Sequence, residues 1–177
     1  VKLLCMLYQN WLEDSVEKDY QLEEVFYLPN MISRIGFEGI KTINKPNDDV
    51  VRIGMMGSLR SVADFRYFLP VFKRIKEKYQ DKVELIIFGW DGKNAKGKKV
   101  FKDLDIAYCK SVSFLDYYKT LMNLHLDVML IPMRSLHYYQ YANTIKFIEA
   151  AAIGLPVIAL KYSSFSTLIE DGKNGFL

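Results

Sequence analysis

Short runs of apolar residues that alternate with helical patterns constrain the fold of this chain more than any other feature. Each run is nearly continuous, and the runs lie at residues 51–57, 83–89, 106–109, 127–132 and 155–160. Amphipathic segments separate them, such as residues 65–79, whose apolar side chains recur at helical spacing. Strands that are apolar on both faces and alternate with helices form parallel sheets. The sequence therefore predicts an α/β fold with a parallel sheet flanked by helices.

The first 49 residues have a different pattern from the rest of the chain. Residues 24–28 are typical of a strand that a Pro-Asn pair interrupts, and residues 36–49 have the composition of a linker with a turn-rich end. We therefore predict a link with the remnant of a preceding domain in residues 1–49, and the domain that contains the sheet in residues 50–177. A strand pattern is cut short at the last residue, which indicates one piece of a longer protein.

Composition excludes several classes of protein. Hydrophobic residues make up 50% and charged residues 25% of the 177, which is typical of a globular protein and excludes disorder for most of the chain. No apolar run reaches the roughly 18 residues of a membrane helix, and a net charge of +3 does not indicate nucleic acid. The two cysteines and two histidines lack the spacing of a disulfide scaffold or a metal site, so we expect a cytoplasmic protein without metal.

Residues 92–99 nearly match a phosphate-binding loop. Two glycines and Lys98 fit the motif, but Lys99 stands where magnesium binding needs a hydroxyl group. A phosphate loop also continues directly into a long helix, whereas acidic residues follow soon after this one. We interpret residues 92–99 as a solvated basic loop. The chain also lacks a Gly-x-Gly-x-x-Gly fingerprint after the first strand and a Gly-x-Ser-x-Gly elbow, which disfavours a dinucleotide oxidoreductase and a hydrolase.

Residues 143–159 carry the strongest candidate site. Asn143 can begin a helix whose free backbone amides point at the ligand-binding edge of the sheet, ready for phosphate. Glu149 lies just under two turns further along, three alanines at 150–152 allow close packing on the sheet, and Gly154 ends the helix. A carboxylate near a phosphate cradle can accept both hydroxyls of a ribose. The residues alone leave two alternatives open, a nucleotide site and an ordinary packed helix with Glu149 exposed.

The same segment resembles the nucleotide-sugar-binding motif of retaining GT-B glycosyltransferases of the group 1 type. The family motif runs Lys-x-x-Glu-Ala-x-Ala-x-Gly-x-Pro-Val-Ile-Ala, and residues 146–159 match it as KFIEAAAIGLPVIA. A turn that follows in the family, Ile-x-Asp-Gly-x-Asn-Gly, is matched by residues 169–175 as IEDGKNG. Residues 27–32 are similar to the link between the two domains of the family. The resemblance implies a Rossmann-like sheet, the C-terminal half of a GT-B fold.

A donor site follows from the resemblance. Glu149 would hold the ribose hydroxyls, backbone amides at the helix start would meet the diphosphate, and Arg60 is the nearest basic candidate for a catalytic role. Basic side chains and the helix N-terminus would carry the charge of the leaving group, so neither a metal nor a cofactor is implied. The implied donor-binding residues are Gly57, Asn143, Thr144, Ile145, Lys146 and Glu149.

Three departures from the family pattern concern this site. Tyr141 occupies the position of the first Glu in the Glu-x7-Glu pair of the family. The Arg and Lys that usually follow the first strand are out of register, and residues 162–165 replace a Gly-Gly pair. These departures keep open a non-catalytic nucleotide-binding or scaffold domain derived from the same fold.

The expected activity is transfer of a sugar from a UDP- or GDP-type donor to a saccharide or lipid-linked acceptor, in polysaccharide or glycolipid biosynthesis. The acceptor would bind an N-terminal domain that is missing here, so residues 1–177 alone are expected to be inactive. We expect a cytoplasmic location, peripheral association of the full-length protein with the inner face of the membrane, and no nucleic-acid partner.

Overall fold

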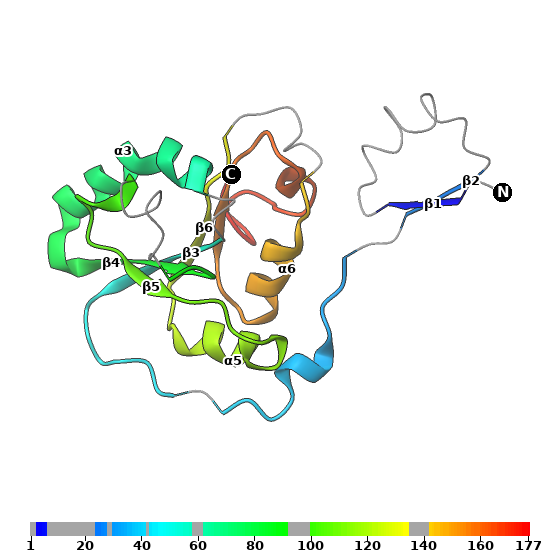
Figure 1. The fold of residues 1–177 in the computed structure, drawn as a ribbon, viewed down its shortest axis with the longest axis horizontal. Helices are drawn as coiled ribbons and strands as arrows, with labels where there is room; N and C mark the ends of the chain where they lie inside the picture. Colours follow the sequence, from blue (N-terminus) through cyan, green and yellow to red (C-terminus); the bar gives the residue numbers. More distant parts are fainter. Residues whose placement is uncertain are drawn as a thin grey trace.

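A five-stranded sheet is the framework of this protein. The structure, a computed structural model, describes residues 3–6, 24–27, 30–41, 43–57, 62–91, 100–134 and 142–177. The strands lie in the order β5-β4-β3-β6-β7 (Figure 1), and every neighbouring pair is parallel. The predicted α/β fold with a parallel, Rossmann-like sheet is therefore confirmed. The strands are β3 (Val51–Met56), β4 (Val83–Phe88), β5 (Ala107–Cys109), β6 (Val128–Ile131) and β7 (Val157–Ala159).

Apolar cores fill both faces of the sheet, because the central strands are apolar on both sides. On one face, α3 buries Phe65 and Phe72 against β3 and β4. On the other face, α5 and α6 contribute Leu121 and Ala150 to a second core (Figure 1). None of the described helices is both long and apolar enough to cross a membrane. These helices are α3 (Val62–Tyr79), α5 (Phe114–Asn123) and α6 (Ile145–Ala152).

The start of α6 differs from the prediction. The helix begins at Ile145 rather than Asn143. The Asn143 side-chain oxygen still accepts a hydrogen bond from the Ile145 amide at 2.7 Å, as a capping side chain does. The predicted end is confirmed, since Gly154 has a φ of +71°, a left-handed conformation that favours glycine. The expectation of three alanines against the sheet is wrong, because Ala150 alone among them is buried.

The amino-terminal segment forms its own small sheet and then runs along the domain. β1 (Leu3–Met6) and β2 (Glu24–Tyr27) pair in parallel, so the strand expected near residue 24 is confirmed and β1 is an additional one. After the 3-10 helix η2 (Arg34–Phe37), the chain passes beneath α5 in the view of Figure 1. The ring of Phe37 lies 4.0 Å from that of Tyr118, centroid to centroid, which fastens this segment to α5.

Gly89, directly after β4, is expected to be a position where alanine destabilises the fold. Its φ is +103°, and an added Cβ would lie 3.0 Å from the backbone carbonyl oxygen of Gly57. We expect Gly89→Ala to lower the free energy of unfolding by about 1–3 kcal/mol, measured by urea denaturation.

Gly172→Ala is the matched control, because Gly172 also has a positive φ, +76°, with no atom within 4 Å of an added Cβ. Its expected cost is the backbone strain alone, about 1 kcal/mol. Equal losses for the two variants would show that crowding of the added Cβ against the Gly57 carbonyl adds nothing to the cost of backbone strain.

Candidate functional site

An ion pair joins two distant segments at the carboxyl edge of the sheet. Arg134 follows β6, and Asp64 lies in the first turn of α3. The Arg134 Nε atom lies 2.9 Å from Asp64 Oδ1, and the Arg134 backbone amide donates to the same oxygen at 3.3 Å. Asp64 is only 7% exposed, so this carboxylate needs the bonds that Arg134 provides. The pair therefore fixes the segment after β6 against the start of α3.

Lys146, in the first turn of α6, adds a second cation close to this pair. Its side chain is half-buried, and burial lowers the pKa of its ammonium group. The negative charges of Asp64 and Glu149 act in the opposite direction on that pKa. Lys146 is therefore close enough to two carboxylates to feel their charge, one on α3 and one on its own helix.

Glu149 completes the cluster one turn further along α6. It is half-buried, and Tyr117 on α5 donates a hydrogen bond to Glu149 Oε2 at 2.9 Å. Burial raises the pKa of the Glu149 carboxyl, while the Tyr117 hydrogen bond and the Lys146 charge lower it. Glu149 is therefore not exposed, in contrast to the expectation for an ordinary packed helix.

Asn143, one of the predicted helix-start residues, bonds to the amino-terminal segment. The Asn143 side-chain oxygen accepts a hydrogen bond from the Ile145 amide. The same oxygen accepts a bond from the Asn30 side-chain amide at 2.9 Å, and the Asn143 side-chain amide donates to the Asn30 oxygen at 3.3 Å. One of the amides assigned to diphosphate, that of Ile145, is thus bonded to a side-chain oxygen in this structure. Thr144 is the N-cap residue of the helix.

Gly57 lies where the sequence pattern placed it, at the end of β3. Its amide donates to the Phe88 carbonyl at 2.9 Å, and its own carbonyl lies against Gly89. Gly89 in turn donates to the Cys109 carbonyl at 2.9 Å, and the Ser111 hydroxyl donates to the Gly89 carbonyl at 2.7 Å. Close backbone packing therefore connects the carboxyl ends of β3, β4 and β5.

Other sequence-predicted positions lie outside the described residues. These are Arg60, Tyr141 and the basic loop at 92–99. Among the residues that the structure describes, no three side chains of His, Cys, Asp or Glu come together as metal ligands would.

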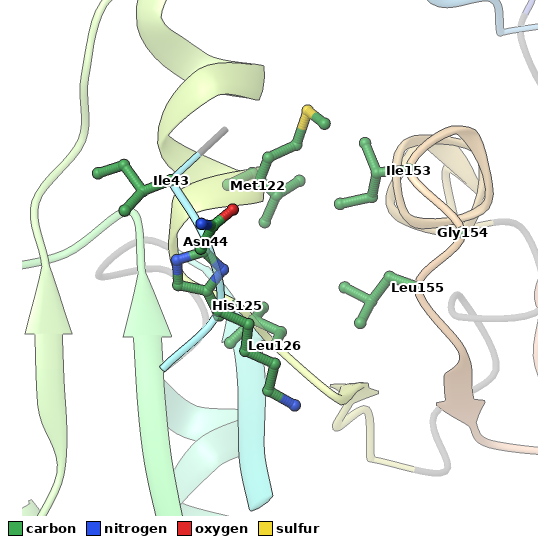
Figure 2. A pocket seen from close by; sticks show the side chains of 10 residues that line it. Ile43, Asn44, Met122, His125, Leu126, Ile153, Gly154 and Leu155 are labelled. Carbon is green, nitrogen blue, oxygen red and sulfur yellow. The ribbon is translucent and has the colours of Figure 1, made fainter. Parts of the chain in front are cut away.

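A cavity of about 350 Å³ lies at the opposite, amino edge of the sheet (Figure 2). Figure 2 shows Ile43 and His125 on one side of it and Leu155 on the other, and all of these residues precede strands. Open parallel sheets bind ligands beyond the carboxyl ends of their strands. The cavity is therefore distinct from the cluster around Glu149.

Sequence reasoning missed three members of the cluster, Tyr117, Asp64 and Arg134. In the sequence, Tyr117 is one of several apolar or aromatic residues at helical spacing in residues 114–124, and Asp64 has the spacing of a capping residue. Nothing in the local sequence indicates partners that lie 32 and 70 residues away along the chain. The signal that could have found Arg134 is its place just after a strand, at the edge where ligands bind.

Comparison with families of known proteins gives one match. The family model described as "Glycosyl transferases group 1" matches residues 50–177. No curated protein matches the chain significantly.

Solved structures share the fold. A mutant of S. aureus TarM in complex with fondaparinux, alpha-GlcNAc-glycerol and UDP has a TM-score of 0.68 and 19% identity, over 98% of this chain and 33% of that one. WaaG, described as a glycosyltransferase involved in lipopolysaccharide biosynthesis, has a TM-score of 0.64 and 18% identity, over 93% and 46%. The lipopolysaccharide outer core galactosyltransferase WaaB, in its apo form, has a TM-score of 0.59 and 16% identity, over 98% of this chain and 47% of that one. The chain thus spans between about a third and a half of the length of these proteins.

Proposed function

The chain belongs to the glycosyl transferases of group 1, and from this premise we propose that the Glu149 cluster binds a nucleotide-sugar donor for a retaining transfer. The observation that carries the proposal is the pairing of a half-buried cation and a half-buried carboxylate, Lys146 and Glu149, in the first two turns of α6. A ribose diol needs acceptors and a diphosphate needs positive charge, and the cluster offers both within one helix.

The proposal gives a role to each site residue that the sequence predicted. Glu149 accepts hydrogen bonds from the ribose hydroxyls, and Lys146 meets the diphosphate together with the backbone around Asn143, Thr144 and Ile145. A phosphate oxygen would take the Ile145 amide from the Asn143 side chain. Gly57 allows close approach at the end of β3, and Arg60 is proposed to stabilise the leaving group. The positive charges of Lys146 and Arg60 support a transfer that needs neither a metal nor a cofactor.

The donor is proposed to carry UDP or GDP, and the acceptor to be a saccharide or a lipid-linked saccharide. UDP bound in the TarM structure and the lipopolysaccharide role given for WaaG support a function in polysaccharide or glycolipid biosynthesis. Residues 50–177 would form the donor domain, with a link and the remnant of an acceptor domain in residues 1–49. The full-length protein is proposed to be cytoplasmic and to associate peripherally with the inner face of the membrane.

A non-catalytic nucleotide-binding or scaffold domain is the second candidate. Tyr141 favours it, because that position holds a sugar-contacting carboxylate in the resembled family. Nucleotide binding with no transfer, even in the full-length protein, would support this candidate.

Residues 1–177 by themselves are expected to bind a nucleoside diphosphate weakly and to transfer no sugar. Transfer requires the acceptor to be held in line with the donor, and this positioning supplies much of the rate enhancement. Calorimetric titration with UDP, GDP, ADP and CMP tests binding, and a radiolabelled-sugar assay of the same sample tests transfer. Absence of binding to all four nucleotides would contradict the proposed donor site, and measurable transfer would contradict the expected inactivity.

A further inference from the structure

The Tyr117 side chain is packed between aromatic rings and bonds to Glu149, the proposed ribose ligand. Its ring lies 5.2 Å from that of Phe88, which is 3% exposed, and 5.2 Å from that of Tyr118 in an edge-on arrangement. Aromatic contacts on two sides restrict both the position and the rotation of the ring. The Tyr117 hydroxyl is therefore a fixed group rather than a mobile one.

This hydroxyl has two neighbours and one proton. It lies 2.9 Å from Glu149 Oε2 and 3.0 Å from the Met56 sulfur. A carboxylate is a much stronger acceptor than a thioether, so the proton is donated to Glu149. Burial and the Glu149 charge both raise the pKa of Tyr117, so its hydroxyl stays protonated and remains a donor.

We propose that Tyr117 is a positioning residue that orients Glu149 and thereby sets a preference for donors with an intact ribose diol. This inference rests on the proposed function. With Oε2 held by Tyr117, the Glu149 carboxylate cannot rotate freely, and its remaining acceptor sites keep one orientation toward the ribose. A flexible glutamate would lose rotamer freedom on binding, and a pre-oriented one loses less.

The test compares Tyr117→Phe with the wild type by calorimetry, with UDP and with 2′,3′-dideoxy-UDP. Phe retains the ring contacts, so the fold is kept while the hydroxyl is removed. We expect affinity for UDP to fall about fivefold, the size of one net hydrogen bond, and affinity for the dideoxy nucleotide to change less than twofold. Tyr67→Phe on the exposed surface of α3 is the matched control, with no change expected for either nucleotide.

The pH dependence of UDP affinity gives a second test, because a Tyr117 that only packed against its neighbours would leave this dependence unchanged on loss of its hydroxyl. The groups that lower the Glu149 pKa are Tyr117 on α5 and Lys146 on α6. The Glu149 charge raises the pKa of Tyr118 on α5, and the charge of Asp64 on α3 acts on Lys146. Removing the Tyr117 hydroxyl removes an influence that lowers the Glu149 pKa, so this carboxyl becomes protonated at a higher pH. The loss of UDP affinity on acidification should therefore begin at a higher pH in Tyr117→Phe than in the wild type.

The outcomes separate this inference from the proposed function. Equal losses for UDP and dideoxy-UDP, with an unchanged pH profile, would overturn the role of Tyr117 while the donor site stands. A wild type that binds the two nucleotides equally, or binds neither, would overturn the proposed ribose site and this inference together. In a Glu149→Gln background, the expected fivefold effect of Tyr117→Phe should diminish, because the oriented carboxylate is gone.

Discussion

Replacing Glu149 with Gln is expected to weaken nucleoside diphosphate binding about tenfold or more. A carboxylate that holds a ribose diol makes two charge-assisted hydrogen bonds, each worth roughly 1.5–3 kcal/mol, and about 1.4 kcal/mol is a factor of ten. Gln keeps the shape but loses the charge and one acceptor. Stability should change little, because burial already disfavours the charged form of Glu149 and a neutral side chain avoids that cost. Calorimetric titration and thermal unfolding measure the two quantities.

Lys98→Ala is the control for the alternative phosphate loop at residues 92–99. The sequence indicates a solvated basic loop there, and loss of one surface charge has a small effect, so nucleotide affinity should stay within about threefold of the wild type. Abolished binding in Lys98→Ala together with normal binding in Glu149→Gln would show that the phosphate-loop interpretation is right and that the glycosyltransferase interpretation of α6 is wrong.

Replacing Lys146 with Gln is expected to lower affinity for the nucleoside diphosphate about tenfold or more. Lys146 is half-buried, and charges are screened less there than at the surface. A hydrogen bond from its ammonium group to phosphate is also charge-assisted. Affinity for the corresponding nucleoside, which has no phosphate, should change less than about twofold. Titration of the same variant with uridine and UDP, or with the pair that binds best, separates these effects.

Lys78→Gln is the matched control for Lys146→Gln, because Lys78 is exposed near the end of α3. Its titrations should match those of the wild type. Equal losses for nucleoside and diphosphate in Lys146→Gln would indicate a distorted helix rather than a missing phosphate contact.

The sheet could be predicted because its strands are continuous in apolar residues, which leaves few alternatives to a sheet covered on both faces. Boundaries near α6 were less predictable, because two adjacent polar residues compete to cap the helix. Asn143 reads as the N-cap, but its side chain bonds the Ile145 amide from one position earlier and Thr144 takes the cap position. Local propensity does not distinguish these two arrangements.

The candidate site was predictable only where its residues share one helix. Lys146 and Glu149 are three residues apart, so their proximity follows from helical spacing. The hydrogen bond from Tyr117 and the ion pair between Asp64 and Arg134 depend on how separate elements pack across the sheet. Such contacts are set by tertiary structure, and no local pattern encodes them.

The Asn143 side-chain oxygen, shared between the Ile145 amide and the Asn30 amide, has a consequence for cooperativity. A ligand that takes the Ile145 amide must compete with Asn143, whose release would also loosen its hold on Asn30. By thermodynamic reciprocity, whatever secures residues 30–41 against the domain changes ligand affinity by the same factor as the ligand changes that docking. Donor binding and the docking of the amino-terminal segment on the domain would then be coupled, so that a measurement of either one would report on the other.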